Sequence, residues 1–377
     1  MPFGHPGRSE GSKKLLSSLA FFIIISNFAT NNLIMRTRKE YIEILTSEYN
    51  QQMKKLISLI AGVAMAFSAH AQDSTANVSM SADTITISFT GDCTLGEYKG
   101  QGAGNQFKDY YNSKGPDYFF ANVKHIFEQD DITFINLEGP LTDHKQVAEK
   151  TFPIKGDVRN INCLTNSSIE MCNIANNHTL DCGEKGVQQT KQLLDSVKIG
   201  VCGYDNIGIV DVHGTKVAFL GYNCLRGYLT KKVSADIIDA KSKADIVIVQ
   251  FHWGEESKNF PNPQQKAMGH AAIDAGADFV VGNHPHVMQG IETYKGKTIL
   301  YSLGNFCFGA NKNSRDKDTF IYVQKFVVSA DGNISYGPSD IIPCRISSVT
   351  TSNNFQPTPL QGADYDRVIS RLKSYKQ

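Results

Sequence analysis

The sequence lacks an excess of charge of either sign. Its 377 residues contain 38 Lys and Arg against 37 Asp and Glu. The near-zero net charge gives no reason to expect that the protein binds nucleic acid or an acidic polymer over its whole surface. A local basic pocket would still be compatible with this net charge. With 41% hydrophobic residues, the chain is expected to form one large globular domain or two modest ones.

The sequence also lacks the close cysteine pairs of a thiolate metal site. None of its eight cysteines shows the CxxC spacing, so a Cys-rich zinc site is disfavoured. The spacing of the cysteines does not indicate a set of disulfide bonds either. Cys93, Cys172 and Cys307 lie in or beside apolar strand-like runs, where we expect buried free thiols.

Long apolar runs are absent as well. The run at 56–67 is shorter than the roughly 20 residues that span a bilayer. Lysines precede it and small residues around Ala71 follow it, so 53–71 is predicted to be a signal peptide cleaved before Gln72. The alternative is an uncleaved anchor. The residue directly after the cleavage point is Gln72 rather than Cys, so we expect an exported protein of the periplasm or cell envelope that is not lipidated.

A signal peptide preceded by fifty residues would not be N-terminal, and this suggests a start at Met53. Residues 1–52 are therefore expected to be an upstream artefact and are excluded from fold prediction. The rest is expected to comprise a linker (72–83), a folded domain (84–348) and a C-terminal tail with an amphipathic helix (349–377).

From Thr84 onward, short apolar β-branched runs alternate with helical patterns, which is typical of an α/β fold. Continuous hydrophobicity at 245–251 and 277–281 predicts strands buried on both faces. Beyond Gly304 the pattern indicates antiparallel strands. The predicted strands are 84–90, 132–136, 169–175, 215–221, 245–251, 277–281, 298–303, 319–329 and 341–348, and the predicted helices are 117–129, 184–197, 232–243, 262–275 and 363–375.

Polar residues gather at the C-terminal ends of these strands. In open α/β sheets that edge is where ligand sites form, because the loops there converge. So many polar residues at the ends of different strands indicate one shared ligand site. The residues are Asp92, Glu138, Asn177, His178, His252, His284, His286 and Asn305.

Two carboxylates, an Asn and several imidazoles suit manganese, iron or zinc rather than calcium. A pair of such ions can bridge a phosphate and lower the pKa of a bound water, which matches hydrolysis of a phosphate ester. In His284-Pro-His286, residues i and i+2 of an extended segment point the same way. Two neighbouring metal ions could therefore take one imidazole each.

The same residues resemble a known family. The segments GDCTLG (91–96), NLEGPLTD (136–143), ANNHTLDCG (175–183), HWGEE (252–256), GADFVVGNHPHVMQGIE (276–292) and YSLGNFCFG (301–309) are similar, in order, to CapA-type capsule or poly-γ-glutamate biosynthesis proteins. These proteins belong to the calcineurin-like metallophosphoesterase superfamily. The resemblance spans about 85–309 and implies a four-layer α/β/β/α sandwich with mixed sheets.

The resemblance implies roles at a first metal ion. Asp92 and His286 would bind this ion, and Glu138 would bridge it to a second metal ion. Many superfamily members begin with Asp-x-His, in which both residues are ligands, whereas here Thr94 holds the third position. The first ion would be weaker or absent, so one or two ions are expected.

The resemblance also implies a second ion bound by Asn177, His252 and His284. His178 would be the acid that protonates the leaving oxygen. Asp181 would either orient His178 or cap the helix that starts near residue 184, and we favour the cap or a mixed role.

Four further residues are candidates around the site. Trp253 is expected to pack beneath it, with substrate stacking as the alternative. Glu256 would either hydrogen-bond a metal-bound imidazole or be solvated. Asn305 is expected to support the site without binding metal. Lys155 is a candidate contact for an anionic substrate.

The signal peptide and the clustered residues predict an exported, metal-dependent phosphoester hydrolase, and the resemblance implies a role in capsule or poly-γ-glutamate-type polymer metabolism. Its expected partners are an anionic polymer or phosphoester substrate and envelope capsule-synthesis proteins, without nucleic acid. Two alternatives stay open, because fold likeness does not establish chemistry. One is a non-catalytic accessory protein that binds or exports a polymer, and the other is metal-dependent amide chemistry on γ-glutamyl bonds.

Overall fold

A computed structural model of the protein describes residues 83–98, 100–225, 227 and 230–375. The predicted upstream segment and signal peptide, and all of the linker except Asp83, lie outside the described residues. Among the described residues, no helix combines the length and the apolar character needed to cross a membrane.

The first sheet has eight strands and is mixed. Its order is β16-β15-β14-β1-β3-β5-β6, and β13 also pairs with β1. β1 runs parallel to β3 and β13 but antiparallel to β14. The strands are β1 (Asp83–Thr94), β3 (Ile132–Leu137), β5 (Met171–Asn173), β6 (Gly200–Cys202), β13 (Asn305–Phe308), β14 (Asp318–Val328), β15 (Ile334–Arg345) and β16 (Thr358–Pro359).

The second sheet has six strands in the order β11-β12-β10-β9-β8-β7. Its central strands are parallel and both edge strands are antiparallel. The strands are β7 (Gly208–Val212), β8 (Thr215–Asn223), β9 (Ile246–His252), β10 (Phe279–Asn283), β11 (Ile291–Tyr294) and β12 (Lys297–Leu300). A separate two-stranded sheet pairs β2 (Glu97–Tyr98) with β4 (Ile154–Lys155).

The two large sheets share one apolar core. Phe89 of β1 stacks on Phe279 of β10 with ring centroids 4.4 Å apart, and Phe134 of β3 lies 4.8 Å from Phe219 of β8. Burial of such aromatic side chains is a major stabilising contribution to a core. The sheets therefore pack face to face, which brings the ends of their strands together.

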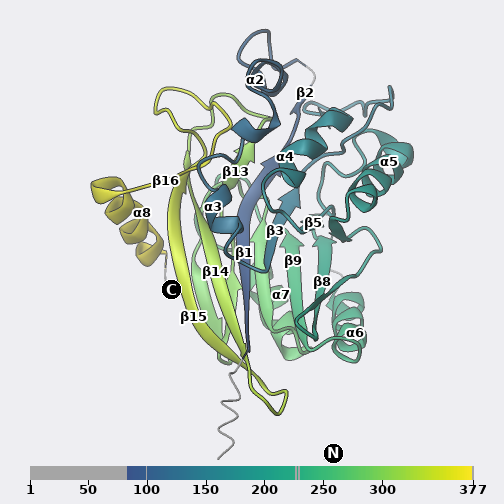
Figure 1. Cartoon of the computed structure of the whole chain (residues 1–377), viewed down its shortest axis with the longest axis vertical. Coiled ribbons are helices and arrows are strands. Elements are labelled where there is room, and N and C mark those ends of the chain that lie inside the picture. The colour runs from purple at the N-terminus through teal and green to yellow at the C-terminus, as the bar shows by residue number, and fades with distance from the viewer. Residues whose placement is uncertain (1–82, 99, 226, 228–229, 376–377) are drawn as a thin grey trace, which may run out of the picture. The chain divides into compact units, whose positions relative to one another are not determined.

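Helices cover the outer faces of both sheets (Figure 1). Over the first sheet lie α2 (Phe107–Lys114), α3 (Lys124–Phe127), α4 (Ile161–Thr165) and α5 (Gly183–Ser196), and over the second lie α6 (Thr230–Lys241) and α7 (Pro263–Asp274). The last helix, α8 (Gly362–Ser374), lies beside β15 and adds Val368 and Leu372 to the core between the sheets. The result is a mixed α/β fold.

The helices predicted at 184–197, 232–243, 262–275 and 363–375 are confirmed as α5, α6, α7 and α8. The helix predicted at 117–129 is wrong as a single element. A 3-10 turn (Pro116–Tyr118) and the four-residue α3 occupy that range. Phe119 and Phe120 between them are fully buried in the outer core, so tertiary packing overrides the local helical pattern.

Several strand boundaries also differ from the prediction. β1 continues to Thr94, so Asp92 lies within the strand rather than after it. β15 begins at Ile334, earlier than the predicted 341. All eight cysteines lie in the described residues and are buried free thiols, as predicted for three of them.

Candidate metal centre

Strand register brings the predicted site residues together. Asp92 of β1 lies opposite Asn136 of β3 and Asn305 of β13. The backbone of β1 approaches closely here, since Asp92 N donates to Gly304 O over 2.9 Å. A Cβ atom at Gly91 would lie 2.2 Å from that same oxygen. Glycine at 91 therefore permits the approach that positions Asp92.

A first group of ligand atoms comes from Asp92, Glu138 and His286, all within 4.8 Å of one another. His286 Nδ1 lies 3.3 Å from Asp92 Oδ2. Both carboxylate oxygens of Glu138 are buried without a hydrogen-bond partner among the described residues. Buried polar atoms are normally paired, so this carboxylate fits a bound cation.

A second group joins Glu256, His284 and His286, again within 4.8 Å. His284 Nδ1 is buried and has no hydrogen-bond partner among the described residues, so it also fits a metal ion. The premise of an extended segment is wrong, because φ is 100° at His284 and 57° at His286. A loop with left-handed backbone, rather than strand alternation, holds the two rings 5.7 Å apart.

Asn177 and His252 lie beside the first group. His252 Nε2 lies 2.8 Å from Asn177 Oδ1 and 3.8 Å from Glu138 Oε1. The His252 ring is fully buried, and its centroid is 4.8 Å from that of His284. These contacts place the expected ligands of a second ion within one cluster around Glu138.

His178 is oriented from its Nδ1 side. This atom lies 2.7 Å from Asp181 Oδ2, while Nε2 lies 3.7 Å from Glu138 Oε1. Asp181 also accepts a hydrogen bond from Ile154 N and pairs with Lys150 over 2.5 Å. The expected cap is wrong, both as a sole role and as part of the favoured mixed role, because α5 starts after Cys182 and no side-chain hydrogen bond caps it. Asp181 orients His178 instead.

Three of the remaining candidates lie at or beneath the cluster. Asn305 Oδ1 lies 2.9 Å from His286 Nδ1 and its amide donates to His286 O over 3.3 Å, so it holds that ring. Trp253 is fully buried, and its indole donates to Tyr301 O. This burial fits packing and is incompatible with substrate stacking. Glu256 is exposed but reaches His284 and His286.

Lys155 is not brought to the cluster by any described contact. Its ammonium group donates to His144 O over 2.8 Å, and the side chain lines a separate cavity bounded by β2, β4 and α2. The described contacts therefore do not support a direct contact between Lys155 and the candidate metal ligands.

A family model described as "Bacterial capsule synthesis protein PGA_cap" matches residues 86–310. The chain belongs to the PGA_cap family. The PGA biosynthesis protein CapA of Bacillus subtilis is 33% identical over 283 residues, which cover 69% of this chain and 72% of the relative. The capsule biosynthesis protein CapA of Bacillus anthracis is 32% identical over 320 residues, 77% and 73% of the two chains.

A third relative, from Mycobacterium tuberculosis, is named "Probable polyglutamine synthesis accessory protein" and is 26% identical over 260 residues. The match covers 58% of this chain and 66% of the relative. The PGA_cap match contains every residue of the cluster, from Asp92 to Asn305.

Burial and mutual charge shift the pKa values in this PGA_cap site in opposite directions. Burial raises the pKa of Glu138 to about 8, and the charge of Asp92 adds to the effect. Burial also acts upward on Asp92, but the hydrogen bond and charge of His286 outweigh it and its pKa falls to about 2. For His286 burial acts downward, yet Glu138 and Asp92 raise its pKa to about 10. Near pH 7, without a cation, Glu138 is therefore mostly protonated, and the ionised Asp92 is the carboxylate that stabilises the charged His286.

The other imidazoles are neutral near pH 7. Burial lowers the pKa of His178 and takes that of His252 well below its usual range. Burial and the charge of His286 lower the pKa of His284 to about 4. A neutral imidazole is the form that binds a metal ion.

Several residues of the site were not predicted. Asn136, fully buried in β3, donates to Asp92 Oδ1 and accepts from the amides of Asn173 and Asn176. A polar residue inside an apolar strand was the available signal, since buried amides are kept only with partners. Lys150 lies in an irregular loop, and no local pattern marks it.

Proposed function

We propose that the chain is a metal-dependent phosphoester hydrolase of capsule or poly-γ-glutamate-type polymer synthesis. The main observation behind this proposal is that the Glu138 carboxylate is buried and that neither of its oxygens has a hydrogen-bond partner among the described residues. An unpaired buried carboxylate costs several kcal/mol. A bound cation would offset that cost, and the surrounding Asp and His side chains are ligands that suit one.

The proposed ligands form two overlapping sets. Asp92, Glu138 and His286 would hold one ion of manganese, iron or zinc. A second ion would be held by Glu138 with the set Asn177, His252 and His284. When bound, such ions polarise a phosphoryl oxygen and lower the pKa of a coordinated water.

His178 is proposed to protonate the leaving oxygen from its imidazolium form, which burial disfavours and the Asp181 carboxylate at Nδ1 favours. Asp181 accepts at the Nδ1 side, which leaves Nε2 directed toward Glu138. Lys150 lies within 2.5 Å of Asp181 and donates to Asn177 O over 3.2 Å. Asp181 contacts His178, and Lys150 contacts both Asp181 and the Asn177 backbone. These contacts hold the proton donor His178 and the metal ligand Asn177 in fixed positions.

The architecture and the relatives are consistent with this proposal. Two packed sheets with helices on both outer faces support a calcineurin-like four-layer α/β/β/α sandwich. Because relatives are named for PGA biosynthesis, capsule biosynthesis and polyglutamine synthesis, the proposed setting is a polymer-synthesis system of the cell envelope. Export through 53–71 is part of the proposal.

The test measures metal content per chain and manganese-dependent turnover of bis-p-nitrophenyl phosphate on the same samples. The parent is compared with His284→Ala and His286→Ala, and with His125→Ala as control, since His125 is exposed on α3. About two ions with turnover lost in both site variants supports the proposal. One ion or none, without turnover, refutes the binuclear hydrolase.

A second candidate is a non-catalytic accessory protein that binds or exports a polymer. Thr94 favours it, because this buried residue stands where many superfamily members have a ligand His, and its hydroxyl has no partner among the described residues. Binding of poly-γ-glutamate that survives chelation, together with absent turnover, would support this candidate over the hydrolase.

A further inference from the structure

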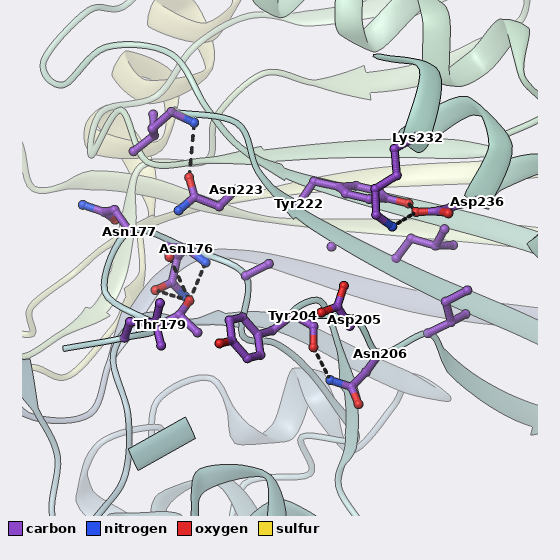
Figure 2. Close-up of a pocket in the computed structure, with 16 residues that line it drawn as sticks. Asn176, Asn177, Thr179, Tyr204, Asp205, Asn206, Tyr222, Asn223, Lys232 and Asp236 are labelled. Carbon is purple, nitrogen blue, oxygen red and sulfur yellow. Dashed lines mark hydrogen bonds and ion pairs between the residues drawn. The ribbon is translucent and has the colours of Figure 1, made fainter. Parts of the chain in front are cut away.

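A cavity of about 560 Å³ adjoins the metal cluster on the Asn177 side (Figure 2). It is bounded by the loop after β5, the turn between β6 and β7, the end of β8, and α6. Asn177 lies at one end of the cavity in this view and also contacts His252. A group attached to a phosphoryl at the cluster would therefore extend into the cavity, whose volume suits a small molecule.

The charge of the lining disfavours a polyanion. Lys232 is held 2.7 Å from Asp236, and Asp205 adds a second carboxylate. A γ-glutamyl chain carries a carboxylate on every residue and would need cations along its path. The cavity instead offers a neutralised lysine and an additional negative charge.

Among the described residues, the rest of the lining is polar without charge or apolar. Asn177 and Asn223 present amide groups, and the Tyr222 hydroxyl donates to Asp236 over 2.9 Å. Leu180 and Ile207 are 48% and 41% exposed. Neutral hydrogen-bonding groups beside exposed apolar and aromatic surfaces match a sugar, which has hydroxyl edges and C–H faces.

The turn that carries Tyr204 has an unusual backbone. Tyr204 and Asp205 have φ of 49° and 65°, and hydrogen bonds between Gly203 and Asn206 close the turn. Turns with positive φ at both central residues normally use Asn and Gly, because a bulky side chain is disfavoured there. The Tyr204 hydroxyl donates to Glu184 of α5 and the side chain packs against the outer core, so these contacts fix the tyrosine on the cavity wall, where a ligand can meet it.

We propose that this cavity binds a sugar unit that is linked to the phosphoryl group of the substrate. Tyr204 and Tyr222 contact the sugar, and Asp236 and Asn223 bind its hydroxyls. The inference rests on the proposed function, because the phosphoryl group lies at the metal cluster. It narrows the substrate class to glycosyl phosphates or sugar-containing phosphodiesters.

The experiment uses the full chain and two matched variants. Tyr204→Asn removes the ring and relieves the backbone conformation. His213→Asn relieves a similar φ of 52° in the turn between β7 and β8, outside the cavity. Affinities for glucose 1-phosphate, galactose 1-phosphate and N-acetylglucosamine 1-phosphate are compared with inorganic phosphate by calorimetry in manganese. Saturation-transfer NMR with the three methyl glycosides reports sugar binding without metal.

The expected result is that at least one sugar phosphate binds about tenfold tighter than phosphate, as one added stacking or hydrogen-bonding contact predicts. Tyr204→Asn should abolish this difference in affinity, and His213→Asn should keep it. Equal affinities for phosphate and every sugar phosphate overturn the inference but leave the hydrolase standing.

Failure of the hydrolase is recognised separately. If the protein neither binds phosphate nor turns over the ester, the proposed hydrolase is refuted. The NMR experiment with methyl glycosides then tests by itself whether the cavity binds a sugar. Saturation transfer that is lost in Tyr204→Asn supports the sugar site, whereas no transfer overturns it. Displacement of a bound glycoside by a γ-glutamyl hexapeptide also overturns it, since the cavity would then hold the polymer.

Discussion

Asn136 donates its side-chain amide to Asp92 Oδ1 over 2.8 Å, and both side chains are fully buried. The same Asn136 accepts from Asn173 over 2.9 Å. A row of amides therefore connects the centre of the first sheet to the candidate metal ligands. The site depends on residues that never touch an ion.

The first prediction concerns this row. Asn136→Leu keeps the branched side-chain shape but leaves the buried Asp92 Oδ1 without its donor and removes the oxygen that accepts from the Asn173 amide. We expect the free energy of unfolding to fall by about 2–4 kcal/mol, measured by urea denaturation in chelator. Asn162→Leu, on the exposed surface of α4, is the control and should change it by less than about 0.5 kcal/mol. Equal losses in both variants would show that the row contributes nothing.

The second prediction separates metal binding from stability. In chelator, Glu138→Gln should unfold at the same or a higher temperature, because it removes a buried carboxylate whose oxygens lack partners among the described residues. Asp92→Asn should instead lose about 1–3 kcal/mol, since Asp92 accepts from Asn136 and lies 3.3 Å from His286. Both variants should lose bound metal. A strongly destabilised Glu138→Gln would indicate a structural role for that carboxylate.

The third prediction concerns the acid. His178→Gln should lower turnover of a phosphate ester with an alkoxide leaving group by about 10²–10⁴-fold while metal content is retained. Turnover of bis-p-nitrophenyl phosphate should change much less, because p-nitrophenolate leaves without protonation. Asp181→Asn should give a smaller loss, because it weakens orientation only. His144→Gln, in the loop that follows β3, is the control. Unchanged turnover of the alkoxide ester in His178→Gln would exclude His178 as the proton donor.

The fourth prediction concerns α8 and pH. Burial acts to raise the pKa of Asp318, but hydrogen bonds from Arg367 and Arg371 outweigh it and lower the pKa below 3.8. A depressed folded-state pKa gives stability that is present above the unfolded value and is lost as pH falls through the folded one. Thermal stability should therefore decline as pH falls below about 4.

Two variants test that cause. Asp318→Asn should lose about 2 kcal/mol near pH 6, the contribution of hydrogen bonds to a charged group, and should show a shallower decline in acid. Asp366→Asn, exposed on α8, is the control and should follow the parent. An unaltered acid profile in Asp318→Asn would assign the decline to other carboxylates.

Much of the site was predictable because parallel strands end at a common edge. Glu138, Asn177 and His252 each follow or close an apolar strand, so their convergence was expected before any contact was known. Asn136 and Lys150 were missed. The only signal for Asn136 was a polar residue inside an apolar strand, and Lys150 lies in a loop without a periodic pattern.

The loop that carries His284 and His286 shows the limit of local rules. Strand alternation predicted that both rings point the same way, but both residues have positive φ. The rings approach each other because Asp92 Oδ2 accepts His284 N and Asn305 holds His286. Those partners are distant in sequence, so no spacing rule contains them.

By itself, the sequence determined the alternation of strands and helices, the kinds of ligand and the strand ends that release them, because these features depend on local periodicity and residue chemistry. Only the tertiary structure decided that Asp181 contacts His178 instead of capping α5, that 117–129 breaks into short turns, and that four distant segments enclose a weakly charged cavity. Each outcome depends on burial and hydrogen bonds between segments far apart in the chain, and such contacts leave no local pattern.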